Sequence, residues 1–300
     1  MNRSNARSWS IGEGRSLDLD PWCLMGILNA TPDSFSDGGD HLDPMAAAEA
    51  GMAMVEAGAA MLDVGGESTR PGAERMSARS QIERVVPVIR ELRRRDAIRS
   101  VVITVDTTLA AVAEAALDAG ADAINDVSAG LEDPEILELA ASRGSGIVLM
   151  HRLLPPDRDR YSDRYEEPPD YGDVVQDVRT FLQARAGRAE EVGVRPEAIA
   201  VDPGLGFGKS VPQNLELVRR LDEIVADGRP VLVGASRKSF LGAISGETDP
   251  RGRGVESVIA AVEAWRRGAG ILRVHEVQGH RRALAVAGAI DDPDTSSWGS

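Results

Sequence analysis

The sequence predicts a single-domain α/β protein of the (β/α)8 (TIM) barrel class. Short apolar runs alternate with Ala-, Glu- and Arg-rich amphipathic segments eight times. Most of these runs are continuous, as in 101–105, which is typical of parallel strands covered on both faces. Polar residues follow nearly every run, and in barrels that end of the strands holds the active site. A doubly wound sheet is the alternative, but no GxGxxG sequence follows the first strand.

The eight predicted strands are short aliphatic runs, each ending in a polar loop. They cover residues 23–29, 61–65, 101–106, 122–126, 146–151, 198–202, 230–235 and 270–275. The predicted helices cover residues 44–58, 78–95, 108–119, 133–143, 173–192, 212–227, 254–268 and 278–289.

These elements set the expected domain boundaries. We expect a loosely attached N-terminal tail over 1–20, a catalytic domain over 21–292 and a C-terminal tail over 293–300. The connection 152–172 is rich in proline and charge, so we expect a mobile surface loop there.

Composition excludes several classes of protein. The formal charge of −14 argues against a nucleic-acid-binding protein and requires a local cation cluster for any anionic substrate. No run of 18 apolar residues exists, so we expect no membrane span, and the N-terminus lacks the apolar segment of a signal peptide. Cys23 is the only cysteine, which excludes an intrachain disulfide and favours a cytoplasmic setting.

Lysine usage draws attention to two positions. Only Lys209 and Lys238 occur among 34 lysines and arginines, so arginine serves for nearly every surface cation. A compact ammonium and a planar guanidinium are not interchangeable at a specific site. We therefore expect these lysines to be functional, with chance survival as the alternative.

Polar residues at the strand ends indicate where the site lies. A single polar strand end could be a helix cap, but eight converging sets are hard to explain by capping alone. The set comprises Asn29, Glu67-Ser68-Thr69-Arg70, Asp106, Asn125-Asp126, His151, Asp202, Ser236-Arg237-Lys238, Arg273 and His275.

Three of these residues suit a flat heterocycle. Asp106, Asn125 and Asp202 combine carboxylates and an amide, which can bind the ring N–H and amine of an aminopyrimidine edge, as in a pterin. Lys238 can donate to a ring carbonyl and nitrogen. Taken alone, Asp106 would be a helix N-cap, because a helical segment follows it.

Cationic residues suit a diphosphate. Arg273 and His275 lie two apart on one strand, so both side chains face the same way. Arg70 stands between Thr69 and Pro71, on a loop stiffened by the proline. A structural histidine is the alternative for His275.

The sequence from Gly204 to Ser210 ends like a phosphate-binding loop. Pro203 replaces the first glycine that such a loop requires, so we reject this interpretation. Phe207 lies on the same glycine-rich loop and is a candidate wall for an aromatic substrate.

Two strings carry a family resemblance. MGILNATPDSFSDGG, residues 25–39, and DVGGESTRPG, residues 63–72, resemble the signatures of dihydropteroate synthases. The resemblance covers about residues 22–290. It implies a (β/α)8 barrel, usually a homodimer, that uses Mg²⁺. Such transferases, the targets of sulfonamides, join p-aminobenzoate to 6-hydroxymethyl-7,8-dihydropterin diphosphate in folate biosynthesis. Diphosphate departs first, and the arylamine then attacks to give 7,8-dihydropteroate.

The resemblance also implies roles for individual residues. Asn29 would hold the metal. Asp106, Asn125, Asp202 and Lys238 would bind the pterin. The diphosphate would be bound by Asn29, Thr69, Arg273 and His275. The p-aminobenzoate would be bound by Phe35, Thr69, Arg70, Pro71, Phe207 and Ser239. The residues implied in catalysis are Asp106, Lys238, Arg273 and His275.

Three positions depart from the family pattern. Glu276 replaces an aspartate, Leu205 replaces a phenylalanine, and Arg152 stands where an apolar residue is common. Two other functions stay open. A catalytically silent pterin-binding paralogue would be expected to lose Asn29, Lys238 or the Arg273 and His275 pair. A methyltetrahydrofolate-dependent methyltransferase would lack the diphosphate site and need a corrinoid partner.

Overall fold

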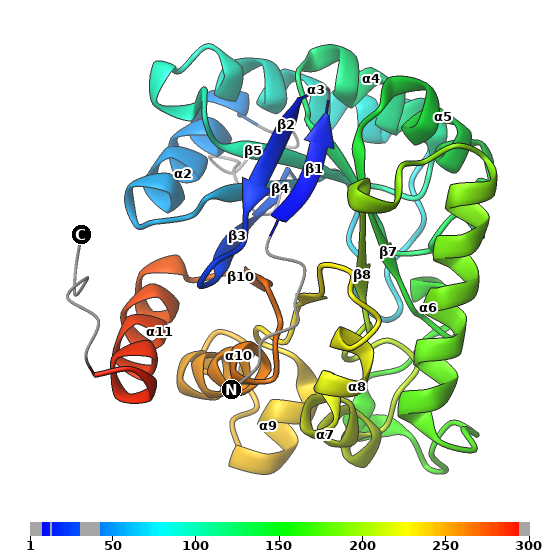
Figure 1. The fold of residues 1–300 in the computed structure, drawn as a ribbon, viewed down its shortest axis with the longest axis vertical. Helices are drawn as coiled ribbons and strands as arrows, with labels where there is room; N and C mark the ends of the chain where they lie inside the picture. The colour runs from blue at the N-terminus through cyan, green and yellow to red at the C-terminus, as the bar shows by residue number, and fades with distance from the viewer. Residues whose placement is uncertain (1–7, 13, 31–42, 294–300) are drawn as a thin grey trace.

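Eight parallel strands form a barrel surrounded by helices (Figure 1). The structure is a computed structural model that describes residues 8–12, 14–30 and 43–293. Neighbouring strands pair in the order β8-β7-β6-β5-β4-β3-β10-β9, and a parallel bridge between Val201 and Val231 links the two ends. The predicted barrel is confirmed. Its strands are β3 (Cys23–Asn29), β4 (Met61–Gly65), β5 (Val102–Asp106), β6 (Ala123–Asp126), β7 (Gly146–Met150), β8 (Ile199–Asp202), β9 (Leu232–Val233) and β10 (Ile271–Val274).

The helices follow the predicted order with two differences. The segment predicted as one helix over 212–227 is two helices, because the backbone leaves the helical region at Arg220. A short helix directly after Lys238 was not predicted. The helices are α2 (Pro44–Glu56), α3 (Ala78–Arg93), α4 (Ala110–Ala119), α5 (Glu135–Arg143), α6 (Val174–Glu191), α7 (Val211–Arg219), α8 (Leu221–Val225), α9 (Ser239–Ser245), α10 (Gly254–Arg266) and α11 (Val277–Asp291). Short 3-10 turns lie at Asp96–Ile98, Pro156–Arg158, Ser162–Arg164 and Pro196–Ala198.

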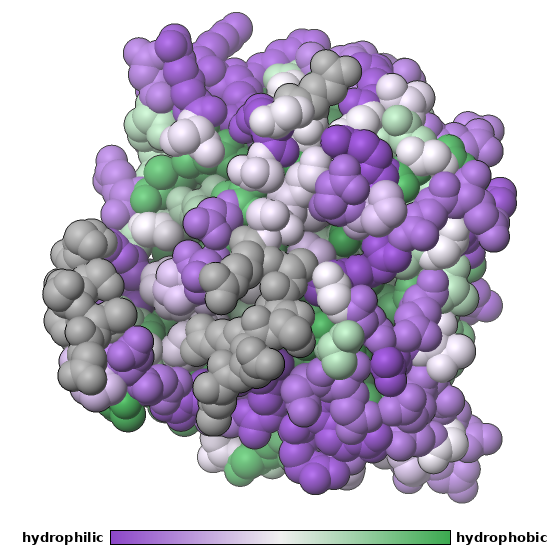
Figure 2. All heavy atoms as spheres, viewed as in Figure 1, coloured by the Kyte–Doolittle hydropathy of each residue, from purple (hydrophilic) through white to green (hydrophobic). Residues whose placement is uncertain are grey.

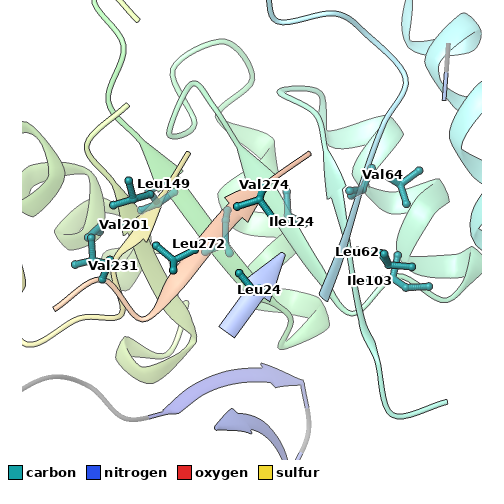
Figure 3. Packing of buried hydrophobic residues seen from close by; sticks show 14 of the residues in the cluster. Leu24, Leu62, Val64, Ile103, Ile124, Leu149, Val201, Val231, Leu272 and Val274 are labelled. Atoms are coloured by element: carbon teal, nitrogen blue, oxygen red, sulfur yellow. The ribbon is translucent and has the colours of Figure 1, made fainter. Parts of the chain in front are cut away.

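The main core lies between the strands and the helices. Alternate strand residues such as Leu24 and Leu62 point outward into this layer (Figure 3). The residues between them, such as Met25 and Met61, belong to a second cluster inside the barrel. Each strand is therefore buried on both faces, which explains its continuous apolar sequence.

A β-hairpin covers the N-terminal end of the barrel. Strands β1 (Ser8–Gly12) and β2 (Arg15–Asp18) pair antiparallel and lie across the barrel (Figure 1). Trp9 is fully buried, packs with the inner cluster and donates from Nε1 to the Ala198 carbonyl at 2.8 Å. The predicted loosely attached tail is therefore wrong for residues 8–12 and 14–18, because buried Trp9 and Ile11 alternate with polar residues along β1, which pairs with β2.

The segment 152–172 is attached to the barrel, contrary to the expectation of a mobile surface loop. Buried Asp159 accepts hydrogen bonds from the Gly208 amide at 2.9 Å and the Tyr165 hydroxyl at 2.6 Å. The Ser162 amide donates to Ser239 Oγ at 3.1 Å. These contacts join the segment to the loops after β8 and β9.

The face that carries the hairpin is largely hydrophilic (Figure 2). In the described part of the chain, no helix has the length and apolar character needed to cross a bilayer.

Candidate active site

The polar strand ends meet through an ion network centred on Arg273. Its Nε donates to Asp63 Oδ2 at 2.6 Å, and its Nη2 donates to Asp106 Oδ2 at 2.8 Å. Asn125 Nδ2 also donates to Asp63 Oδ2, at 3.0 Å, and Thr104 Oγ1 donates to Asp63 Oδ1. Strands β4, β5, β6 and β10 are thus joined by side chains inside the mouth of the barrel.

Asp63 is the residue that our sequence analysis missed. It is completely buried and orients both Arg273 and Asn125. A detectable signal existed, because Asp63 lies within the apolar run Met61–Gly65. A buried carboxylate is tolerated only with partners, so its position implied a cation or amide nearby.

Asp106 faces the mouth and does not cap a helix. The N-cap of α4 is Leu109, whereas the Asp106 carboxylate pairs with Arg273. Burial raises the pKa of Asp106 to about 7, against the effect of Arg273 and with added repulsion from Asp63 and Glu67. Burial therefore disfavours the ionised form of Asp106, and Arg273 favours it.

Asn125 and Asp202 offer hydrogen-bond acceptors to a ligand. Asn125 Oδ1 is buried and has no hydrogen-bond partner among the described residues. Such an orphaned acceptor is costly unless a ligand satisfies it. Asp202 accepts from the Gly204 amide through Oδ1 at 2.7 Å. Burial raises the pKa of Asp202 to about 6, although the Gly204 amide and Lys238 lower it.

Lys238 lies over an aromatic ring. Its Nζ is 3.8 Å from the centroid of Phe207, a cation–π contact. Burial, and then the charge of Arg273, lowers the pKa of Lys238 to about 8. Phe207, predicted to contact an aromatic substrate, is only 7% exposed, and its ring contacts the Lys238 ammonium.

Lys209 has a different environment from Lys238. It is fully buried, and its Nζ lies 2.9 Å from His151 Nδ1, the Gly204 carbonyl and the Phe207 carbonyl. These three acceptors match the three N–H groups of an ammonium. Burial and Lys209 lower the pKa of His151 to about 2, so its ring is neutral. Lys209 therefore holds the glycine-rich loop from inside.

Four cations gather around His275. Its Nδ1 lies 3.0 Å from Ser236 Oγ. Burial, and then the charges of four cations, lowers the pKa of His275 to about 3. In a chain of net charge −14, this cluster is a local concentration of positive charge, which an anionic substrate would require. The four cations are Arg237, Arg273, Lys238 and Arg70.

Arg237 follows β9 among the polar strand ends, but it was not predicted as a site residue. Its φ of +62° lies in the left-handed region, which costs energy for a non-glycine residue. The Arg237 amide donates a hydrogen bond to the Ser257 hydroxyl at 2.9 Å, and Arg253 Nη1 donates to the Arg237 carbonyl at 3.0 Å. The fold thus fixes an unfavourable backbone conformation within this cation cluster.

The other predicted residues lie at the rim. Asn29 is the last residue of β3, and Thr69 and Pro71 are half-buried on the loop after β4. Arg70 is exposed on the same loop, and Ser239 begins α9. Phe35 lies outside the described residues.

The side-chain amide of Asn29 suits a metal ion whose other ligands are mainly phosphate oxygens and water. Mg²⁺ accepts amide oxygens but usually keeps waters and substrate phosphates as its other ligands. The described residues contain no group of three or more His, Cys, Asp or Glu side chains able to hold a metal. One amide oxygen could therefore contribute only part of a coordination shell.

Comparison with known proteins identifies the family. A family model described as pterin binding enzyme matches residues 25–275. The dihydropteroate synthase of Mycobacterium leprae is 45% identical over 91% of this chain and 95% of that protein. The chain belongs to the dihydropteroate synthase family. It is accordingly a transferase of folate biosynthesis.

Related proteins extend this result. The Synechocystis dihydropteroate synthase is 43% identical over 89% of both chains. A Xanthomonas albilineans dihydropteroate synthase with 4-aminobenzoic acid has a TM-score of 0.85 and 40% identity, covering 96% of this chain and 99% of that one. The same enzyme in complex with 7,8-dihydropteroate has a TM-score of 0.81 and 39% identity, covering 93% and 97%.

Proposed function

We propose that the protein condenses 6-hydroxymethyl-7,8-dihydropterin diphosphate with p-aminobenzoate, giving 7,8-dihydropteroate and diphosphate. One observation carries this proposal: the orphaned acceptor of Asn125 and the cation cluster around His275 lie in the same mouth, linked through Arg273. Such a site can hold the heterocycle and the diphosphate of one substrate together.

The pterin would be bound by the buried strand ends. Asp202 and Asn125 Oδ1 accept hydrogen bonds from the ring N–H and the amine, and Lys238 donates to the ring carbonyl and nitrogen. Asp106 lies beside the ring, paired with Arg273. Because the pKa of Asp202 is about 6, this group is mostly ionised at neutral pH, as an acceptor of two N–H bonds must be.

Departure of diphosphate is the step that the cation cluster serves. The C–O bond of the hydroxymethyl group breaks, and its electron pair leaves with the diphosphate. Arg273, His275 and Thr69 bind the anion, and fixed cations stabilise the charge that develops. Asn29 would hold Mg²⁺ on the diphosphate, where the metal supplies charge neutralisation.

The arylamine then attacks the pterin methylene carbon, which is positively charged after diphosphate leaves. The C–N bond forms from the nitrogen lone pair, and the nitrogen then transfers one proton to water. Asp106 stabilises the cation electrostatically, so no nucleophilic side chain is required. We infer that p-aminobenzoate is bound at the rim. Solved relatives hold 4-aminobenzoic acid or, in the Yersinia pestis enzyme, a sulfonamide drug, which supports binding of an arylamine. The residues inferred to bind it are Phe35, Thr69, Arg70, Pro71, Phe207 and Ser239.

We also infer a cytoplasmic homodimer. An open groove of about 680 Å³ lies between α10 and α11, which contact each other and are neighbours in the ring of helices (Figure 1). Ile259 and Ile290 line it and are 59% and 68% exposed, which is unusual for large apolar side chains. Light scattering should report twice the chain mass, and Ile259→Asp with Ile290→Asp should give a monomer. A wild-type monomer at micromolar concentration would refute the dimer.

The decisive measurement is product formation by the purified protein. The assay contains the pterin diphosphate and Mg²⁺, with and without p-aminobenzoate. Diphosphate release that depends on p-aminobenzoate and yields dihydropteroate would support the proposal. Tight pterin binding without product would indicate the silent paralogue, whereas absence of pterin binding would refute the assignment of the pocket.

A further inference from the structure

Glu67 joins the two ends of the loop that follows β4. This loop, residues 66–77, carries Thr69, Arg70 and Pro71 at the rim of the mouth. The Glu67 carboxylate accepts from the Met76 amide at 2.6 Å and from Arg75 Nε at 3.1 Å. The beginning and the end of the loop are thereby fixed to each other.

The Nη1 and Nη2 atoms of Arg75 pair with Glu132, which lies between β6 and α5. Nη1 donates to Oε1 at 2.5 Å and Nη2 donates to Oε2 at 2.8 Å, a bidentate pair. Thr108, on the loop after β5, also donates its hydroxyl to Glu132. The loops after β4, β5 and β6 therefore meet at one carboxylate.

Arg152 brings a fourth loop to this carboxylate. It is the residue that stands where the family commonly has an apolar one, and its side chain is only 7% exposed because it pairs with Glu132. The Gly72 amide, near the tip of loop 66–77, donates to the Pro156 carbonyl at 2.8 Å. Arg75 is thus linked through Glu132, and Gly72 directly, to the segment that begins at Arg152.

Glu132 stays ionised at neutral pH. Burial alone would raise the pKa of Glu132, but hydrogen bonds from Arg75 and Thr108 and the charge of Arg152 lower it to about 2. Glu132 and Glu67 balance Arg75 and Arg152, so the network is neutral. In contrast, Asp106 and Asn125 are held by Arg273 and Asp63 on the strands themselves.

We propose that Glu132 is a positioning residue that holds loop 66–77 over the mouth for the second substrate. It acts through Arg75 on the loop that carries Thr69 and Arg70, and it does not itself contact p-aminobenzoate. This inference rests on the proposed function. The strand residues that would bind the pterin ring are fixed by Arg273 and Asp63, and Thr69 is the only residue on the loop assigned to the diphosphate. Loss of Glu132 therefore weakens p-aminobenzoate binding much more than binding of the pterin diphosphate.

The test is Glu132→Gln in the full chain, with Asp227→Asn as control. Asp227 also forms a multiple-bond pair, with Arg179, and its side chain is 17% exposed against 19% for Glu132. The KM for p-aminobenzoate should rise about tenfold in Glu132→Gln, with kcat and the KM for the pterin diphosphate within about twofold. The control should change neither KM.

Limited trypsin digestion provides a second readout. Cleavage after Arg75, mapped by mass spectrometry, should be about tenfold faster in Glu132→Gln than in the wild type or the control. Arg152→Leu, which leaves Arg75 paired with Glu132, should change both readouts in the same direction by about threefold. This variant decides the question if Glu132→Gln does not fold.

An unchanged KM for p-aminobenzoate in folded Glu132→Gln would overturn the inference. So would an equal rise of both KM values, or the same change in Asp227→Asn, since either would indicate a general loss of stability. If the wild type forms no dihydropteroate, the proposed function fails. The trypsin comparison then still decides whether Glu132 holds the loop.

Discussion

The two ends of the barrel are built from the same strands but from opposite kinds of residue. At the N-terminal end, Trp9 of the hairpin packs on apolar residues such as Met25 and Met61. At the C-terminal end, the same strands end in Asp106, Asn125, Asp202 and other polar groups, several of them buried. The N-terminal end is closed by apolar contacts, and the C-terminal end holds a network of charged and polar side chains.

The residues that stabilise the fold and the residues expected to bind substrate therefore lie at opposite ends of the barrel. Apolar burial at the closed end lowers the free energy of the folded state. Buried carboxylates at the open end raise it, because their pKa values of about 6 to 7 show that the ionised form is disfavoured there. Changes at one end should therefore affect stability with little loss of activity, and changes at the other end should do the reverse.

The largest expected effect is at the open end. Lys238→Ala and Asp202→Ala should each abolish turnover, a loss of about a thousandfold or more, because each removes a charge that, in the proposed function, binds the pterin. The melting temperature should not fall in either variant. Steady-state kinetics and thermal denaturation check this, and near-wild-type turnover in either folded variant would contradict the pocket.

The reverse result is expected for Trp9→Ala. Removal of this fully buried indole should lower the free energy of unfolding by about 3–5 kcal/mol. Turnover per folded molecule at 25 °C should stay within about twofold of wild type, because the hairpin lies at the far end of the strands. Urea denaturation and kinetics on the same preparation test this, and a parallel loss of turnover would refute the separation.

A smaller effect should depend on pH. The pKa of Asp202 is about 6, above its ordinary value, so the folded state binds this proton more tightly than the unfolded state. The stabilisation is complete below about pH 4 and is lost as the pH rises through about 6. Relative to Asp202→Asn, the wild type should lose on the order of 2 kcal/mol over this range. Urea midpoints measured across the range test this, and a pH-independent difference would argue against the raised pKa.

The smallest effect is expected for the ion pair at the edge of the hairpin. Arg15 Nη1 lies 2.5 Å from Asp122 Oδ1, but the arginine side chain is 48% exposed and Asp122 also pairs with Arg93. Arg15→Ala should cost less than about 1 kcal/mol, since solvent screens exposed pairs. Urea denaturation should place it far below Trp9→Ala, and equal effects would show that the hairpin is held mainly by charge.

Local patterns were sufficient to predict the barrel. Continuous apolar runs gave β3 and β4 with their observed bounds, and the helices fell close to the predicted ranges. The hairpin was missed because β1 and β2 are only five and four residues long and are paired with each other, outside the β/α alternation. The attachment of 152–172 was missed because it depends on Asp159 reaching Gly208, across a long separation in sequence.

By itself, the sequence determined the barrel, the polar strand ends and the family, because strand period, loop composition and motif order are local properties. Only the tertiary structure decided which side chains are paired. It placed Asp63 between Arg273 and Asn125, buried Lys209 beneath the loop that Lys238 faces, and joined four loops at Glu132. These contacts join residues far apart in the chain, so they depend on the curvature that brings the strands into a barrel.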